Sequence, residues 1–340
     1  MPSTQLPQVS VVIPTRNRWK LLRDHALDSA LAQVDVTVEV IVVDDASTDE
    51  TAERLATFRD DRVRVIRHEA RKNRSRARNA GLAAARGEWI AFLDDDDLWA
   101  PGMLRAQLET AQRERASLVC GALVLVDDTL NVIERVQAPD PRHLARSLLR
   151  SSVIHCPAAV TVRTDLVREA GGFDERLNEI EDWDLWIRIA AETRAAACKE
   201  VLVAYLVHSQ NTNVSNDSRV FDELAYLLDK HRAAREQAGV AFDSANFVRY
   251  VAIGHLRANR RRDAVSLYIR SALADRNVGN ALRAPLAVLG KRALTIRELR
   301  TARAARPEPW WIVQRRQVLQ RKVDRSNDHE DRRQPPARRQ

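Results

Sequence analysis

Short apolar runs alternate with longer polar stretches through the first part of the chain. The runs at residues 9–13, 38–43, 63–66 and 89–93 are almost wholly apolar, which is typical of strands covered on both faces. Three stretches have the composition of helices: residues 19–32, residues 76–85, and a segment that begins at 47–50 and ends at Phe58. This alternation predicts an α/β fold, with a Rossmann-like, mostly parallel sheet and helices on both faces.

Polar residues follow three of these strands directly. They are Pro14, Thr15 and Arg16 after the first strand, Asp45 after the second, and the four aspartates 94–97 after the fourth. Ligands of open α/β sheets bind beyond the carboxyl ends of the strands. We therefore expect a binding site at this edge of the sheet.

The pattern changes near Ser215, where strand-like runs stop and segments rich in Ala, Leu and Arg begin. Residues 220–237, 245–258 and 261–274 are predicted helices, and the pattern breaks down again from Pro307. We expect a catalytic domain over 1–215 and a smaller all-α C-terminal module over 216–306. Residues 307–340 should form a basic amphipathic segment whose end, 326–340, is disordered.

Composition and charge exclude several classes of protein. The 340 residues are 45% hydrophobic and 30% charged, which excludes a wholly disordered chain. The net charge of +8 is unevenly placed, because residues 219–340 carry +14 and residues 1–218 carry −6. An acidic first part argues against a nucleic-acid groove there, whereas a basic last part suits an anionic membrane surface or solubility alone.

The cysteines and the apolar runs indicate the cellular compartment in which to expect the protein. Three widely spaced cysteines suggest neither a disulfide framework nor a zinc site. No signal-like segment opens the chain, and the apolar run 201–207 is far shorter than a membrane span. We expect a cytoplasmic protein, with the inner face of the membrane as a second location.

The four aspartates predict a metal site. Like charges packed together repel one another unless a cation is present. In an extended segment Asp94 and Asp96 would point the same way and Asp95 elsewhere. Carboxylate oxygens without nearby cysteine select Mn²⁺ or Mg²⁺. The alternative is a solvated acidic loop before a helix that starts near Pro101.

Six motifs, in order along the chain, resemble those of the inverting family 2 glycosyltransferases of the GT-A fold. They lie at residues 9–17 (VSVVIPTRN), 40–49 (VIVVDDASTD), 77–81 (ARNAG), 87–97 (GEWIAFLDDDD), 171–174 (GGFD) and 181–186 (EDWDLW). The resemblance covers about the first 215 residues. It implies a nucleotide-diphosphate sugar as donor.

The resemblance also implies roles on the donor side. Pro14, Thr15, Arg16 and Asp45 would line the nucleotide pocket, with Asp45 accepting a hydrogen bond from the base, usually uracil. A carboxylate could also accept from thymine or guanine, and Asp45 could instead cap a helix. Further expected contacts are Arg78 on the diphosphate, Asp94 and Asp96 on the metal, Asp95 near the donor sugar or ribose, and His208 on the metal or diphosphate.

On the acceptor side, the same resemblance makes Asp182 the general base. Apolar positions at Trp183, Trp186, Ile187 and Ala190 follow helical spacing, so the helix is anchored and its first turn can face the cleft. The alternatives are that Glu181 is the base or that both carboxylates only complement the helix dipole. The glycines at 171–172 predict a turn with positive φ that shapes the acceptor side.

Near the end of the chain, tryptophans and aliphatic residues alternate with arginines between 310 and 322. This composition suits a membrane interface, and equally a docking contact on the helical module.

Together these features predict a metal-dependent inverting glycosyltransferase. It would transfer sugar from a UDP-sugar to a hydroxyl of a glycan or lipid-linked acceptor in cell-surface polysaccharide synthesis. A nucleotidyltransferase or dehydrogenase would be expected to carry a glycine-rich phosphate loop after the first strand, and residues 14–18 contain no glycine. An inactive sugar-nucleotide-binding scaffold of the same fold is the remaining alternative.

Overall fold

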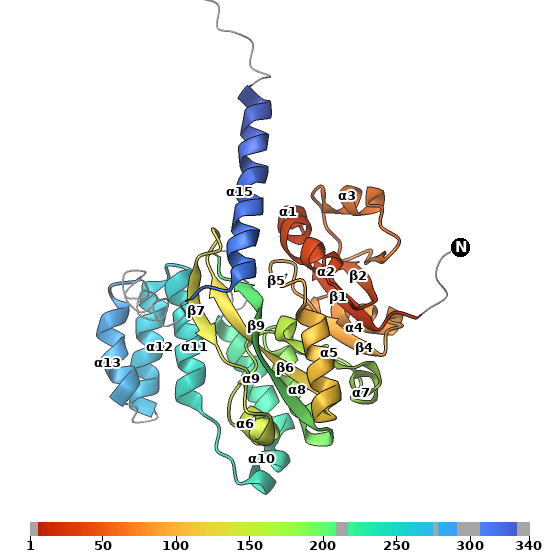
Figure 1. The fold of residues 1–340 in the computed structure, drawn as a ribbon. Coiled ribbons are helices and arrows are strands. Elements are labelled where there is room, and N and C mark those ends of the chain that lie inside the picture. The colour runs from red at the N-terminus through yellow and green to blue at the C-terminus, as the bar shows by residue number, and fades with distance from the viewer. Residues whose placement is uncertain (1–5, 209–216, 275–277, 291–306, 332–340) are drawn as a thin grey trace, which may run out of the picture.

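A computed structural model describes residues 6–208, 217–274, 278–290 and 307–331 (Figure 1). The strands are β1 (Val9–Thr15), β2 (Val38–Asp44), β3 (Val63–Arg67), β4 (Trp89–Phe92), β5 (Leu98–Trp99), β6 (Leu118–Val126), β7 (Val132–Val136), β8 (Val160–Arg163) and β9 (Ala195–Leu206). The first helices are α1 (Trp19–Leu21), α2 (Asp28–Leu31), α3 (Thr51–Thr57), α4 (Arg74–Ala84), α5 (Met103–Glu114), α6 (Leu144–Arg150), α7 (Thr164–Glu169) and α8 (Glu181–Glu192). They are followed by α9 (Asp217–Lys230), α10 (Arg232–Ala238), α11 (Ser244–Arg257), α12 (Arg261–Ala274), α13 (Val278–Ala287) and α15 (Trp310–Asp331).

The strands form one sheet in the order β3-β2-β1-β4-β8-β6-β9-β5, with β7 paired to β6. Strands β3, β2, β1 and β4 are parallel to one another, as the alternating pattern predicts. Beyond β4 the sheet is mixed, because β8 is antiparallel to β4 and β6, and β5 is antiparallel to β9. The predicted α/β class is confirmed. Strands β1, β2 and β4, after which the binding site is predicted, belong to the parallel region.

Two apolar cores cover the two faces of the sheet. Alternate residues of a strand point to opposite faces, and β1 divides its side chains accordingly. Val11 and Ile13 pack in one core with Leu22 and Leu27 from the helical stretch after β1. Val12 packs in the other core with residues of α4 and α8. β3 is an exception to the predicted burial, because it is an edge strand and its residues are only partly buried or exposed.

The predicted helix over 19–32 is continuous but not regular. A π-helical segment, Leu22–Leu27, lies between α1 and α2. The predicted helix over 220–237 is instead two helices, α9 and α10, which meet at His231.

The C-terminal helices share a core with the sheet domain. Val220 and Leu224 of α9 and Phe247 and Val251 of α11 belong to the same buried cluster as Trp183 of α8. Figure 1 shows α11, α12 and α13 on the opposite side of the molecule from α3. The described residues from 217 on are helical, and their apolar core is continuous with that of the sheet domain.

Helix α15 docks by its first turn and then extends away from the rest of the molecule (Figure 1). Trp311 and Ile312 are buried against strands β5, β6 and β9, and the Trp311 indole donates to the carbonyl of Val201 (2.9 Å). The docking contact is thus with the sheet rather than with the helical module. The helix runs through Asp331, so the part of 326–340 that the structure describes is helical; residues 332–340 lie outside it. None of the described helices combines the length and apolarity needed to cross a membrane.

Candidate active site

The carboxyl ends of β1 and β2 form the floor of the site. Thr15 pairs with Asp44 in register, and the Asp45 amide donates to the Thr15 carbonyl (2.9 Å). Asn17, with φ of 55°, joins the two following loops: its amide N–H donates to Ser47 Oγ (2.9 Å) and its Oδ1 accepts from the Thr48 amide (2.7 Å). These contacts hold the two loops together.

Asp45 faces the site rather than capping a helix. The helix-start contacts are made by its neighbours, because Asp44 accepts from the Ser47 amide and Asp49 from the Thr51 amide. Asp45 is 7% exposed, and its Oδ1 accepts from the Lys72 amide (2.9 Å) and lies 2.8 Å from His68 Nδ1. Within the described contacts, its second oxygen is left for a ligand.

The four aspartates form a turn, not the extended segment expected from the sequence. The Asp97 amide donates to the Asp94 carbonyl (3.1 Å), and Asp94 and Asp96 have different partners, Arg78 for the first and Arg18 for the second. Asp95 accepts from Thr15 Oγ1 (2.8 Å) and from Arg18 Nη1 (3.1 Å). Asp94 and Asp96 therefore do not share one direction, because a turn breaks the two-residue alternation of a strand.

Asp97 is a structural member of the four. It is fully buried and accepts from the Leu206 amide (3.2 Å), which ties the turn to β9. Burial, and then the charges of Asp96 and Asp94, raise the pKa of Asp97 well above its usual range. A neutral carboxyl at this position relieves part of the repulsion within the cluster.

Asp96 and His208, both predicted as metal ligands, contact each other. Asp96 Oδ2 lies 2.9 Å from His208 Nε2. Adjacent ligands of an octahedral ion with bonds of 2.0–2.1 Å stand about 3 Å apart, so both atoms fit one Mn²⁺ or Mg²⁺. Such ions complete their shells with waters and substrate phosphates. In the described part of the chain no three His, Cys, Asp or Glu side chains gather as a full metal site. The pair fits an ion that binds together with a phosphate ligand.

Arg18 competes for the same carboxylate, since its Nη1 donates to Asp96 Oδ2 (2.9 Å). It follows the predicted Pro14–Arg16 segment but lay outside the predicted site. An ion bound at Asp96 would therefore share this carboxylate with Arg18 or replace it there.

Arg78 joins two carboxylates from opposite sides of the site. Its side chain is fully buried, donating to Asp94 Oδ1 (2.5 Å) and Glu181 Oε1 (2.5 Å). Burial alone would raise the pKa of Asp94, but Arg78 and Arg74 outweigh it and hold that pKa below its usual range. Arg78 thus connects the aspartate turn to the first turn of α8.

Asp182 lies on that first turn and has the chemistry of a base near neutral pH. Its Oδ1 accepts from the Trp183 amide (2.8 Å). Burial, and then the charge of Glu181, raise the pKa of Asp182 to about 7, although Arg78 opposes the shift. A carboxylate with a pKa close to the working pH accepts and releases a proton efficiently.

Two cavities meet at this group of residues. The front cavity, of about 690 Å³, is lined by Pro14, Thr15, Arg16, Asp45 and Asp94–Asp96. The inner cavity, of about 220 Å³, is lined by Arg78, Asp94 and Asp182. Arg74, Asp94, Glu179 and Tyr205 line both. Seven of the donor-side residues predicted from the sequence therefore line one cavity. Arg78, predicted to contact the diphosphate, lines only the inner cavity, and His208 contacts Asp96 but lines neither cavity. Asp182, the predicted base, lines the inner cavity.

Comparisons with known proteins agree with this arrangement. A sequence profile described as "Glycosyl transferase family 2" matches residues 10–170. The chain is also 31% identical over 301 residues to the succinoglycan biosynthesis protein ExoO of Rhizobium meliloti (strain 1021), covering 83% of this chain and 82% of ExoO. The chain belongs to glycosyltransferase family 2.

Further similarities are consistent with this family. The Escherichia coli protein named UDP-Glc:alpha-D-GlcNAc-diphosphoundecaprenol beta-1,3-glucosyltransferase WfgD is 29% identical over 221 residues, which cover 65% of this glycosyltransferase and 84% of WfgD. Among solved structures, the mannosyltransferase PcManGT of Pyrobaculum calidifontis, in complex with GDP-Man and Mn²⁺, has a TM-score of 0.52 at 21% identity, covering 89% of this chain and 87% of that one. S. aureus TarS 1–349, in complex with UDP-GlcNAc, has a TM-score of 0.51 at 19% identity, covering 78% and 72%. These structures show the same GT-A fold.

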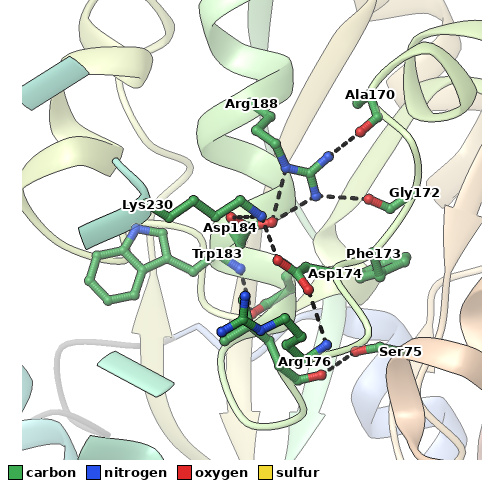
Figure 2. Close-up of polar contacts among 12 residues, drawn as sticks. Ser75, Ala170, Gly172, Phe173, Asp174, Arg176, Trp183, Asp184, Arg188 and Lys230 are labelled. Atoms are coloured by element: carbon green, nitrogen blue, oxygen red, sulfur yellow. Dashed lines mark hydrogen bonds and ion pairs between the residues drawn. The ribbon is translucent and has the colours of Figure 1, made fainter. Parts of the chain in front are cut away.

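The helix that carries Asp182 in this glycosyltransferase is anchored by a buried ionic cluster (Figure 2). Asp184 is fully buried and accepts from Arg188 Nε (2.9 Å); it also lies 2.9 Å from Lys230 Nζ and 2.8 Å from His231 Nε2. Arg188 in turn donates to the carbonyls of Ala170 and Gly172 (Figure 2). The cluster fixes α8 to the end of α9, the first of the C-terminal helices, and to the turn that contains Ala170 and Gly172.

That turn has the predicted form. Gly171 and Gly172 have φ of 79° and 72°, and a Cβ on Gly172 would lie 2.6 Å from Asn79 Oδ1. Phe173 packs edge-to-face on Phe92 with ring centroids 4.8 Å apart. Only glycine combines positive φ with this close approach.

Several site residues escaped the sequence prediction. Arg18, Arg176, Arg219 and Glu223 line the front cavity, and residues of α11 line the inner one. Arg71, Lys72 and Arg74 also line the front cavity. The cluster of basic residues at the start of α4 was the available signal for the latter three, and Arg18 lies only two residues after the predicted Arg16. The others come from segments far away in the sequence.

Proposed function

We propose that this enzyme is a metal-dependent, inverting glycosyltransferase that moves a sugar from a UDP-sugar to a hydroxyl of a glycan or lipid-linked acceptor in cell-surface polysaccharide synthesis. The observation that carries the proposal is the junction of the two cavities at Asp94 and Tyr205. Nucleotide-side residues lie on one side of it and Asp182 on the other. The names of ExoO, in succinoglycan biosynthesis, and of WfgD, acting on a diphosphoundecaprenol-linked sugar, support this process.

The nucleotide lies against Asp45 in this proposal. A uracil ring presents an imide N–H, and the open oxygen of Asp45 accepts it. Thr15 and Arg16 line the same end of the front cavity. The diphosphate is then met by the cations that line this cavity, Arg71, Lys72, Arg176 and Arg219. Arg78 is fully enclosed between Asp94 and Glu181 and contributes by holding these carboxylates.

Asp96 and His208 are the proposed metal ligands, with Asp94 beside them. A bound Mn²⁺ or Mg²⁺ supplies Lewis-acid stabilisation of the charge that develops on the leaving diphosphate. Arg18 moves from Asp96 while keeping its bond to Asp95, and Asp95 stays near the donor sugar or ribose through Thr15.

Asp182 is the proposed base. Inversion requires a group that takes the acceptor proton on the face of the sugar opposite the leaving diphosphate. Asp182 lines the inner cavity but not the front one, whereas Asp94 lines both. Glu181, its neighbour, is engaged by Arg78 and Arg74, which leaves Asp182 as the better base.

The proposal also assigns a location. A lipid-linked acceptor lies at a membrane surface, and we place the enzyme at the cytoplasmic face. Trp310 and Arg321 of α15 are exposed and suit contact with anionic headgroups.

A panel of nucleotide sugars tests the donor. With Mn²⁺, UDP-sugars should raise the melting temperature and be turned over, because a ligand at a hundred times its Kd stabilises the native state by about 2.7 kcal/mol. GDP-sugars should shift it less. The Asp45→Ala variant should lose this preference, and Asp61→Ala, an exposed carboxylate near β3, should keep it. Equal shifts with UDP- and GDP-sugars would refute uracil recognition, and no nucleotide release from any donor would refute the proposed activity.

The pH dependence of turnover tests the base. The charged and titratable neighbours of Asp182 are Glu181, Arg78 and Asp94, and together with burial they place its pKa at about 7. Because only the carboxylate accepts a proton, kcat/KM should increase with pH and level off above about pH 7. Initial rates measured across this range, with UDP binding measured in parallel as a control, give the profile. A flat rate between about pH 6 and pH 8 would contradict the assignment.

A further inference from the structure

Helix α9 carries four polar side chains along one face. Arg219, Glu223, Tyr226 and Lys230 are three or four residues apart, which places them on the same side of a helix. Three of them, Glu223, Tyr226 and Lys230, bind residues between 174 and 184, the segment that leads from the glycine turn into α8. Arg219 and Glu223 also line the front cavity. Helix α9 therefore contacts both the donor side of the site and the helix of the proposed base.

Glu223 holds the backbone that leads into α8. Its Oε1 accepts from the Asn178 amide (3.0 Å), and its Oε2 accepts from the amides of Glu179 (2.8 Å) and Ile180 (3.3 Å). Ile180 is the N-cap residue of α8, and its side chain makes no capping hydrogen bond. The start of a helix leaves amides without intrahelical acceptors, and a negative charge is favourable there. Glu223 therefore fixes the entry to α8 from another helix.

Asp182 lies two residues beyond the last of these contacts. Its carboxylate accepts from the Trp183 amide (2.8 Å), so its position follows the backbone of the first turn of α8. Misplacing a reacting group by about 1 Å can lower a rate by about a hundredfold. Glu223 can therefore set the position of the proposed base through the backbone of residues 178–180.

Tyr226, one turn further along α9, holds a cation of the front cavity. The guanidinium carbon of Arg176 lies 3.9 Å from the centre of the Tyr226 ring. The Tyr226 hydroxyl donates to Asp174 Oδ2 (2.7 Å), and Asp174 Oδ1 accepts from the Arg176 amide (3.0 Å). Figure 2 shows Lys230 joining Asp174 to Asp184 of α8. A guanidinium stacked on a ring keeps its N–H edges for an anion, so Arg176 is oriented before the diphosphate binds.

We infer that α9 positions both reacting ends of the site, with Glu223 as the positioning residue of the proposed base and Tyr226 as that of Arg176. Neither side chain takes part in making or breaking bonds. The inference rests on the proposed function for the roles of Asp182 and Arg176. If α9 only stabilised the fold, changes at Glu223 and at Tyr226 would have the same effect. As positioning residues of different groups, they should instead change different kinetic quantities.

Glu223→Ala tests the link to the base. With Mn²⁺ and saturating UDP-glucose, UDP-galactose or UDP-N-acetylglucosamine, kcat for nucleotide release should fall by roughly ten- to a hundredfold. The affinity for UDP should be unchanged or higher, because the substitution removes a carboxylate from the cavity proposed to take the diphosphate. Glu223→Gln keeps one acceptor oxygen and should retain part of kcat. Amide hydrogen exchange over residues 175–184 should be faster in Glu223→Ala, a measurement that needs no turnover.

Tyr226→Leu tests the link to Arg176. It should weaken UDP binding by about three- to tenfold, the effect of having to order one long side chain on binding, while kcat at saturating donor stays near the wild-type value. Tyr226→Phe keeps the ring and should keep most of the UDP affinity. Asp222→Ala removes an exposed carboxylate next to Glu223 on the same helix and should behave as the wild type in every measurement.

The pattern across the variants decides between positioning and stability. Parallel losses of kcat and UDP affinity in Glu223→Ala and Tyr226→Leu would show a common effect on folding and overturn the inference. Wild-type hydrogen exchange in Glu223→Ala, or wild-type UDP affinity in Tyr226→Leu, would also overturn it. A wild type that releases no nucleotide from any donor would refute the proposed function. Faster exchange in Glu223→Ala and weaker UDP binding in Tyr226→Leu would still support the positioning roles in that case.

Discussion

Replacing Asp182 by asparagine should lower kcat for sugar transfer by roughly a hundred- to ten-thousandfold, the usual contribution of a positioned general base. The amide has nearly the same shape and can still accept from the Trp183 amide, but it cannot take the acceptor proton. UDP affinity should be unchanged, because Asp182 does not line the front cavity. Single-turnover assays with a nucleotide sugar and acceptor, beside UDP binding by calorimetry, measure both quantities.

Stability provides the control for this variant. The pKa of Asp182 is about 7 in the folded protein, against an ordinary value of 3.8. The unfolded chain therefore loses this proton at lower pH, and the contribution of Asp182 to stability falls as the pH increases from about 4 to 7. Asp182→Asn should then melt at or above the wild-type temperature at pH 8. Glu192→Gln, at the exposed far end of α8, should keep full activity. Wild-type turnover by Asp182→Asn would exclude Asp182 as the base.

The part of the fold that the sequence predicts well is the part with strong periodicity. Strands β1, β2 and β4 are nearly continuous apolar runs because helices cover both faces, and their bounds agree with the predicted ranges within about two residues. Carboxyl ends of parallel strands meet at one edge. The position of Thr15, Asp45 and the aspartates beside one cavity thus follows from chain order alone.

The sequence did not predict the local geometry of the four aspartates correctly. Alternation along a strand predicted a common direction for Asp94 and Asp96, but the chain turns immediately after β4. Arg78 then attracts Asp94, while Arg18 and His208 attract Asp96. These partners are separated from the aspartates by up to 112 residues, and no local pattern reports such contacts.

The inner cavity shows a second limit of sequence reasoning. Helix α11 is recognisable from its composition, but its periodicity does not say that Asn246 and Tyr250 face Asp182 across a cavity. That placement depends on the ionic cluster around Asp184, which fixes α8 to the end of α9, and on the core that Phe247 shares with Trp183. Tertiary contacts between distant helices, rather than propensity, decide which residues line this cavity.

Removing Asp96, the proposed metal ligand, should have an effect comparable to removing Asp182, the proposed base. Asp96→Asn should reduce turnover by at least about a hundredfold, because the charge on the departing diphosphate loses its main stabilising partner. The variant should fold, since Arg18 keeps its hydrogen bond to Asp95 when Asp96 becomes neutral. Chelation of the wild-type enzyme should have the same effect, and added Mn²⁺ should restore the wild type but not the variant.

Binding of Mn²⁺ itself separates this role from a structural one. Electron paramagnetic resonance titration in the presence of UDP should show one site in the wild type, weakened in Asp96→Asn and in His208→Gln, whose side chain is 2.9 Å from Asp96. Asp128→Asn, which removes the same charge from the exposed β6–β7 loop, should bind Mn²⁺ and turn over as the wild type does. Full-rate sugar transfer after exhaustive chelation would show that the reaction needs no metal. The pairing of Asp96 with His208 would then be explained by contacts with Arg18 and β9 alone.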